Sequence, residues 1–140
     1  MKYKVYELTA SADVDKLHDV LAFADNLLEE HNCPMKAQMQ IDVALEELFV
    51  NIAHYAYPDS SGEAVIRISF TAEYVQITLS DSGIPYNPLA KPDPDITLNA
   101  QERPIGGLGI FMTKKLMDDI SYEYSDGNNL LTIKKKIKPC

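Results

Sequence analysis

A carboxylate and an amide stand one helical turn apart in the stretch EELFVN. Glu47 and Asn51 are four residues apart, and in a helix that spacing puts both side chains on the same face. In a magnesium–nucleotide site an amide oxygen can ligate the cation, while a carboxylate can accept the proton of an attacking hydroxyl or water. Taken alone, the pair is better explained as an ordinary solvated helix face, which carries the same residue types. It therefore needs support from other parts of the chain.

Three glycines precede an apolar run in the stretch GGLGIFMT, at residues 106–113. A helix that begins here presents unpaired backbone N–H groups, which suit a phosphate chain, and a backbone without side chains lets that chain come close. The stretch is not a Walker loop, because no Gly-Lys-Ser or Gly-Lys-Thr follows it, and it lacks the preceding strand of the dinucleotide fingerprint. The alternative is a flexible turn. A phosphate site at Gly106, Gly107 and Gly109 would belong to a different nucleotide fold.

A third polar stretch, DSGIPYNP, directly follows the apolar segment YVQITLS. Asp81 ends that segment, where its carboxylate can accept a hydrogen bond from an exocyclic amine, a charge-assisted bond worth about 1.5–3 kcal/mol. Gly83 leaves room for a flat ligand near the backbone. Asp-Ser-Gly is also an ordinary turn sequence, and that is the alternative interpretation.

The periodicity of apolar residues places these stretches on a framework of helices and strands. Helical spacing predicts helices over residues 13–31, between Pro34 and Pro58, and over residues 108–119. Ser11 or Asp13 is the expected N-cap of the first helix. Alternation and β-rich composition predict strands at residues 2–9, 64–70, 74–81, 120–125 and 130–137.

The connections between these elements are of two kinds. The strands at 64–70 and 74–81 are joined so tightly that they should be antiparallel neighbours, and DGNN should form the turn of a closing hairpin. The proline-rich stretch at about 83–105 shows no apolar period. A stretch of that length inside a compact domain is typically a functional lid or a disordered loop.

Length and composition indicate one folded domain of 140 residues. A net charge of −8 argues against a direct nucleic-acid partner, because phosphate neutralisation supplies most of that affinity. The chain has no apolar run of the roughly 20 residues that span a bilayer and no signal-peptide core at its start, so we expect no membrane partner and a cytoplasmic location. Cys33 and Cys140 form neither a disulfide framework nor a metal-ligand spacing.

Together, and in this order, the three stretches resemble the sequence boxes of the Bergerat-fold ATPases. ALEELFVNIAHYAYP looks like the N box, DSGIPYNP like the first glycine box and GGLGIFMTKKLMDD like the second. The compact layout is similar to that of the bacterial anti-sigma-factor serine/threonine kinases, from about residue 10 to residue 137. The resemblance implies a single histidine kinase-like ATPase domain over residues 1–140, with a flexible ATP lid at about 83–105. Its fold would be an α+β two-layer sandwich, a mixed, mostly antiparallel sheet with helices packed on one face.

The resemblance also implies roles for individual residues, with ATP and Mg²⁺ as cofactors. Glu47 matches the general base of the N box, and Asn51 matches the asparagine that ligates magnesium. Asp81 matches the aspartate that bonds the adenine amine, with Gly83 as its flat neighbour.

The remaining matches lie in the second half of the chain. Gly106, Gly107 and Gly109 match the glycines that pass under the phosphates at the hinge of the lid. Thr132, in LLTIKKK, matches a late-strand threonine that helps to bind adenine, directly or through water. Arg103 lies just before the second glycine box, where some members carry an arginine that meets the terminal phosphate; a solvated lid residue is the alternative.

The activity that the resemblance implies is that of an ATP-dependent protein serine/threonine kinase. In the resembled family the phosphorylated partner is an antagonist protein, and a sigma factor is the competing client; the acidic chain is compatible with a basic segment of such a client. Two alternatives stay open: a nucleotide-gated partner-switching module that holds ATP or ADP without transferring phosphate, and a slow stand-alone ATPase. The sequence does not decide whether the chain forms a homodimer.

Overall fold

The structure is a computed structural model that describes residues 4–90 and 108–137. Within these segments, five strands form one sheet in the order β1-β2-β3-β5-β4. The strands are β1 (Val5–Ser11), β2 (Glu63–Phe70), β3 (Tyr74–Asp81), β4 (Asp119–Ser125) and β5 (Asn128–Lys136). Every neighbouring pair of these strands is antiparallel. The described part of the sheet is therefore wholly antiparallel, where the sequence predicts a mixed, mostly antiparallel one.

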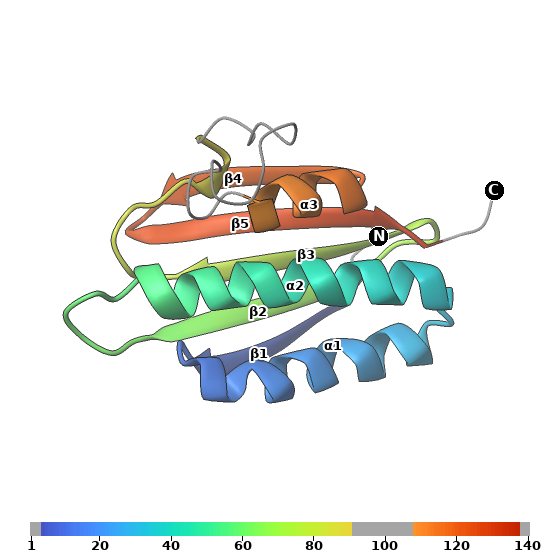
Figure 1. Ribbon diagram of the computed structural model, residues 1–140. Coiled ribbons are helices and arrows are strands. Elements are labelled where there is room, and N and C mark those ends of the chain that lie inside the picture. Colours follow the sequence, from blue (N-terminus) through green and yellow to red (C-terminus); the bar gives the residue numbers. More distant parts are fainter. Residues whose placement is uncertain (1–3, 91–107, 138–140) are drawn as a thin grey trace.

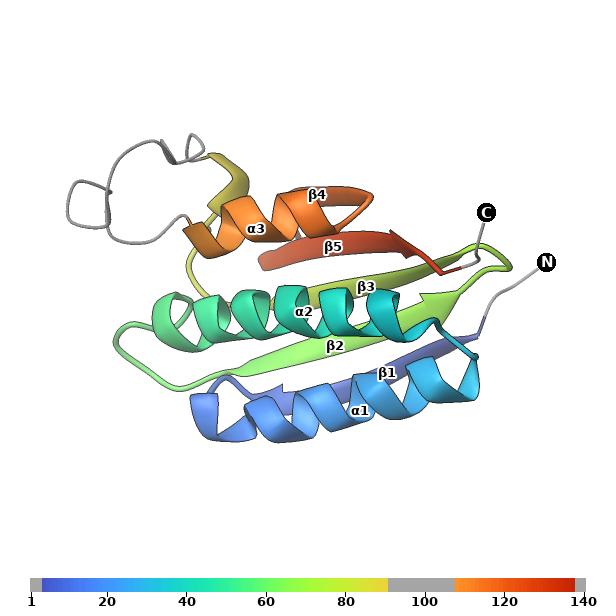
Figure 2. The ribbon, with the colours of Figure 1, turned by 45° about the vertical axis from the view of Figure 1, so that its right-hand side comes forward.

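Helices cover one face of this sheet (Figure 1, Figure 2). They are α1 (Leu17–Glu30), α2 (Met35–Tyr55) and α3 (Leu108–Leu116), with short 3-10 turns η1 (Val14–Lys16) and η2 (Pro88–Ala90). Helix α2 lies between α1 and α3 in the helical layer. The predicted two-layer α+β sandwich is confirmed. In the described segments, no helix combines the length and the apolar character that crossing a membrane requires.

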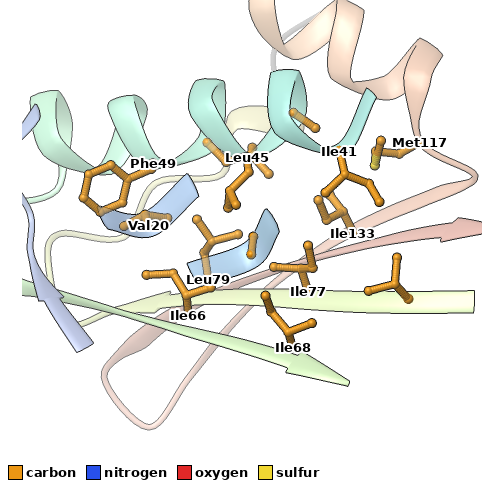
Figure 3. Packing of buried hydrophobic residues seen from close by; sticks show 14 of the residues in the cluster. Val20, Ile41, Leu45, Phe49, Ile66, Ile68, Ile77, Leu79, Met117 and Ile133 are labelled. Carbon is orange, nitrogen blue, oxygen red and sulfur yellow. The ribbon is translucent and has the colours of Figure 1, made fainter. Parts of the chain in front are cut away.

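The core lies between the helices and the sheet, where the apolar side chains of the two layers pack together (Figure 3). On α2, the fully buried residues Ile41, Leu45 and Phe49 recur at intervals of four. Beneath them, alternate residues of β3, including Ile77 and Leu79, point toward the helices. Burying side chains of this size stabilises the fold by about 1.5–3 kcal/mol each. The other side of α2 is left for residues that do not belong to the core.

The N-terminal strand and helix both begin later than predicted. Alternation predicts a strand over residues 2–9, whereas β1 is Val5–Ser11; residues 1–3 lie outside the described segments. Helical spacing predicts a helix over 13–31, whereas α1 follows the 3-10 turn η1. The predicted cap is present, because the carboxylate of Asp13 accepts a hydrogen bond from the N–H of Asp15 (3.0 Å). It caps η1 and not the first turn of α1.

The helix predicted over 108–119 ends early, at Leu116. Two residues on, the N–H of Asp118 donates to the carbonyl of Lys134 (2.9 Å). The carboxylate of Asp118 also accepts a hydrogen bond from the N–H of Lys136 (2.6 Å). The chain has thus joined the edge of β5 before a further helical turn can form.

The turn of the closing hairpin is shorter than DGNN suggests. Asp126 and Gly127 have φ angles of 53° and 80°, the left-handed backbone of a two-residue turn that Asp-Gly favours. Strand β5 therefore begins at Asn128, and Asn129 is already its second residue. Asn129 pairs with Asp81 across the β3–β5 ladder, so both side chains leave the sheet on the same face.

A pair of acidic residues lies between α1 and α2. Asp25 on α1 and Asp42 on α2 each bury a carboxylate oxygen, Oδ1, that has no hydrogen-bond partner among the described residues. Burial raises the pKa of Asp42 from its ordinary 3.8 to about 7, and the adjacent Asp25 carboxyl adds to the rise. Burial and the charge of Asp42 also raise the pKa of the Cys33 thiol. The folded protein therefore holds a proton here that the unfolded chain releases at lower pH.

We predict that this pair makes the fold less stable as the pH rises. Between about pH 4 and pH 7 the native state binds more protons at Asp42 than the unfolded state, so the free energy of unfolding falls with rising pH and then levels off. Asp42→Asn removes this contribution. The difference in melting temperature between variant and wild type should grow across that window in favour of the variant. Exposed Asp59→Asn is the matched control; a constant difference for Asp42→Asn would contradict the prediction.

Candidate nucleotide-binding site

A pocket opens between the C-terminal half of α2 and the ends of strands β3 and β5. Its polar lining residues are Asn51, Asp81, Asn129 and three tyrosines, Tyr55, Tyr86 and Tyr122. The apolar part of the lining comes chiefly from Leu48, Ile52, Leu79, Ile84, Pro88 and Leu131. A largely apolar pocket with a few convergent polar groups is typical of a small-molecule site.

Tyrosine rings narrow this pocket. Tyr55 and Tyr86 both line it, and their rings are stacked with centroids 5.9 Å apart and planes inclined by 29°. The cavity volume is about 40 Å³, which is room for about three water molecules at roughly 10–15 Å³ each. A flat ring system of the size of a nucleobase therefore enters only if the lining side chains move apart.

Asp81 ends β3 with its side chain in the pocket, as the sequence predicts. The residue is only 6% exposed. Its Oδ1 accepts two hydrogen bonds of 2.9 Å, from the backbone N–H of Gly83 and from Nδ2 of Asn129. Within the described segments Oδ2 receives none. One acceptor oxygen is thus available in the pocket for a donor such as an exocyclic amine.

Gly83 has a different role from the one predicted. A Cβ placed on Gly83 would overlap the carbonyl group and the Cβ of Ala56, at the end of α2. The next N–H, that of Ile84, donates to the same carbonyl of Ala56 (2.9 Å). The space expected for a flat ligand is therefore filled by the helix end, and the glycine seats the turn after β3 on α2.

Tyr57 holds the same turn from the other side. Its hydroxyl donates to the carbonyl of Glu63 (2.7 Å) and accepts a hydrogen bond from the N–H of Ser82 (3.0 Å). A Cβ on Gly62 would overlap the ring of Tyr57. The segment that follows Asp81 is thus fixed both to α2 and to the start of β2.

Glu47 and Asn51 lie on one face of α2, as their spacing predicts. Asn51 lines the pocket, one turn before the C-terminal end of the helix. The carboxylate of Glu47 lies against Gly109 in the first turn of α3, because a Cβ on Gly109 would overlap it. Neither side chain has a hydrogen bond to the rest of the described chain, so the carboxylate and the amide are available to a ligand.

Gly109 lets the two helices meet at this point. The hydroxyl of Thr113, which is fully buried, donates to the carbonyl of Gly109 (2.9 Å) and fixes the first turn of α3. The start of α3 and the carboxylate of Glu47 are therefore neighbours, as a site for a phosphate chain and a general base requires.

Several predicted site residues lie outside the described segments. These are Arg103, Gly106 and Gly107, together with most of the predicted lid at 83–105. The first residues of that lid are described and are packed: Pro88 in η2 is buried and lines the pocket, and Leu89 contacts the core. This part of the stretch is a wall of the pocket.

Thr132 does not line the pocket, which contradicts its predicted role in adenine binding. Its hydroxyl is 3.0 Å from that of Thr78, its cross-strand neighbour on β3. The adjacent residues Leu131 and Ile133 are buried under the helices. Because side chains alternate along a strand, Thr132 points away from the helices and the pocket.

Asn129 is a polar pocket residue that the sequence does not predict. It is 6% exposed and bonds directly to Asp81 (2.9 Å). The DGNN stretch contains the available signal, but asparagines are equally typical of a turn. Tyr55, Tyr86 and Tyr122 were missed as lining residues because aromatic residues at such positions are equally typical of core packing.

The fold is a two-layer α+β sandwich with a largely apolar pocket beside its central helix. Residues 10–135 match the family described as the histidine kinase-like ATPase domain. The match spans most of the chain, and the chain belongs to this family. The predicted Bergerat-type architecture is thereby confirmed.

Curated relatives carry the name of a kinase. The chain is 30% identical over 96 residues to the serine-protein kinase RsbW of Bacillus cereus (strain AH187) and, by the same measures, to that of Bacillus mycoides (strain KBAB4). Each alignment covers 66% of this chain and 60% of the relative. The matched segment therefore spans about three fifths of the relatives' own length.

A solved structure shares the architecture. The crystal structure of the RsbU and RsbW domains of Rv1364c from Mycobacterium tuberculosis matches with a TM-score of 0.69 and 16% sequence identity. The match covers 98% of this chain and 34% of that chain. At this identity the likeness shows the fold alone.

We predict that Gly109 and Glu47 are energetically coupled. Gly109→Ala should gain up to about 1 kcal/mol from helix propensity, but the added Cβ must push the carboxylate of Glu47 aside. In a Glu47→Ala background the obstacle is absent, so the same substitution should stabilise more. Urea unfolding of the four proteins in a double-mutant cycle measures the difference, which we expect to be about 0.5–3 kcal/mol.

Exposed Met112→Ala, on the same helix, provides the control. Its effect should add to that of Glu47→Ala without coupling, because the two sites share no contact of this kind. Additivity at Gly109 as well would mean that the two helices do not meet as described.

Proposed function

We propose that residues 1–140 form a single ATP-binding domain that transfers the terminal phosphate of ATP to a serine or threonine of an antagonist protein and sequesters a sigma factor or an analogous client. The observation that carries the proposal is the neighbourhood of three groups: Asp81 with an available acceptor oxygen, Asn51 beside it in the pocket, and Glu47 against the start of α3. The family membership and the name of the curated relatives support the same activity.

The nucleobase would occupy the apolar part of the pocket. Oδ2 of Asp81 accepts a hydrogen bond from the exocyclic amine of adenine, while Leu79 and Leu131 supply apolar contact. A base with a carbonyl in place of that amine would set two acceptors against each other. This asymmetry is the reason to propose an adenine nucleotide.

Magnesium fits the residues that surround the phosphate end. The amide oxygen of Asn51 is a hard oxygen ligand with no competing hydrogen bond in the described segments, and a carboxylate lies one turn away. When bound, the cation would neutralise charge on the phosphate oxygens. The first turn of α3 adds backbone N–H groups at the same end of the site.

Glu47 is the proposed general base. It accepts the proton of the partner's serine or threonine hydroxyl while that oxygen forms a bond to the terminal phosphorus of ATP; the bond from phosphorus to the bridging oxygen breaks, and ADP leaves. Gly109 allows the carboxylate to lie directly beside the phosphate-binding helix start. The partner supplies only the hydroxyl.

The partner remains defined by its chemistry. The net charge of −8 favours a client with a basic segment, because complementary charge accelerates association and disfavours acidic competitors. An antagonist protein that presents a serine or threonine to Glu47 would compete with that client. Nucleotide state would then decide which of the two is held.

Thermal unfolding with magnesium-ATP tests the base site. At about 100 times the dissociation constant, ATP should stabilise the wild type by about 2.7 kcal/mol. Asp81→Asn should abolish this gain: the new Oδ1 still accepts from Gly83 and Asn129, but a donor amine replaces the acceptor Oδ2. Thr132→Val, a control on the other face of the sheet, should keep the gain. Loss of the gain in Thr132→Val would restore the threonine to the site.

Phosphate transfer tests the role of Glu47. With γ-labelled ATP and an extract of cells that make the protein, wild type should label one partner protein on serine or threonine. Glu47→Gln should bind ATP as well as wild type but transfer phosphate about 10²–10⁴ times more slowly, because it lacks only the base. Label released as inorganic phosphate would identify an ATPase, and binding without either product would identify a nucleotide-gated switch.

A further inference from the structure

Asn129 makes a complete set of hydrogen bonds inside the pocket. Its Nδ2 donates to Oδ1 of Asp81 (2.9 Å) and to the carbonyl of Ile84 (2.8 Å). Its Oδ1 accepts from the backbone N–H of Tyr86 (3.0 Å) and from the hydroxyl of Tyr122. Both donor hydrogens and both lone pairs of the amide are therefore used.

These partners allow only one orientation of the amide. If the amide were reversed, its NH₂ group would face the N–H of Tyr86, which cannot accept a hydrogen bond, and only the hydroxyl of Tyr122 could rotate to accept one. Its oxygen would face two acceptors, the carboxylate of Asp81 and the carbonyl of Ile84. At 6% exposure water has little access to repair such contacts, and buried unpaired groups are costly. Nδ2 is consequently held toward Asp81.

We propose that Asn129 is the positioning residue that sets the base preference of the site. Together with the N–H of Gly83, it occupies Oδ1 of Asp81 and leaves Oδ2 as the acceptor that faces the base. The same amide ties the segment at Ile84 and Tyr86, which forms a wall of the pocket, to β5. The proposal rests on the proposed function and assigns to Asn129 the preference for an amino group at the purine 6-position.

Asn129→Asp tests this role because it replaces the NH₂ group of the amide with an oxygen atom and leaves the volume of the side chain almost unchanged. The new carboxylate would lie about where Nδ2 lies, at hydrogen-bond distance from Oδ1 of Asp81. Two carboxylates so close share one proton, and only the protonated pair can keep Asp81 in place. The variant should therefore bind ATP well at pH 5.5 and at least about tenfold more weakly at pH 8.

The probes are ATP and ITP, which carries a carbonyl in place of the 6-amino group. Wild type should prefer ATP at both pH values, whereas Asn129→Asp should prefer it at pH 5.5 and lose most of the preference at pH 8. Asn129→Leu, which adds no charge, should lose the preference at both pH values. A residue that only stabilised the fold would change the melting temperature and leave the ratio of the two affinities unchanged.

Asn128→Asp is the matched control. It adds the same charge one residue away, where within the described segments the Asn128 side chain bonds only to the carbonyl of Asp126 (3.2 Å) in the turn. It should keep the wild-type preference at both pH values. If wild type binds neither nucleotide, the proposed function fails and this inference falls with it. If wild type prefers ATP and folded Asn129→Asp and Asn129→Leu keep that preference at pH 8, only the inference about Asn129 is overturned.

Discussion

The site depends on how α2 divides its surface between the core and the pocket. Successive residues are about 100° apart around a helix, so the rotation that buries Ile41, Leu45 and Phe49 also fixes the direction of Glu47 and Asn51. Each of the buried side chains contributes about 1.5–3 kcal/mol, and no contact of the polar pair could oppose that sum. Hydrophobic packing of one face of α2 thus determines the direction of the carboxylate and the amide on the other face.

The sequence predicts well those features that depend on local periodicity. The helices, the sheet strands, the shared face of Glu47 and Asn51 and the place of Asp81 all follow from spacing within one element. The prediction for Thr132 is wrong because successive side chains of a strand point to opposite faces of the sheet. The resemblance does not determine which of the two faces Thr132 lies on. The role of Asn129 is not predicted for a related reason. Asparagine occurs both in the turn and in the strand of this hairpin, and only the pairing with β3 decides where the turn ends.

Glycines mark a close approach without identifying what approaches. At Gly83 the space is taken by the end of α2, and at Gly109 it is taken by a glutamate carboxylate. Both positions are compatible with the predicted glycine boxes, yet in both the missing side chain accommodates the protein itself. A glycine in a sequence pattern can make room for a ligand or for another part of the protein, and the pattern alone does not distinguish the two.

The cross-strand pairing of Asp81 with Asn129 has a consequence for how the protein is made. In the same ladder Leu79 pairs with Leu131 and Ile77 with Ile133, so the polar pair and the apolar pairs face the helices only in one alignment of the two strands. A slip of β5 by one residue would turn Asn129 outward and expose both apolar residues as well. A misaligned chain would therefore lose its core together with its site. Misalignment of β5 is thus coupled to a large loss of stability, so a chain that folds stably also has Asp81 and Asn129 correctly paired.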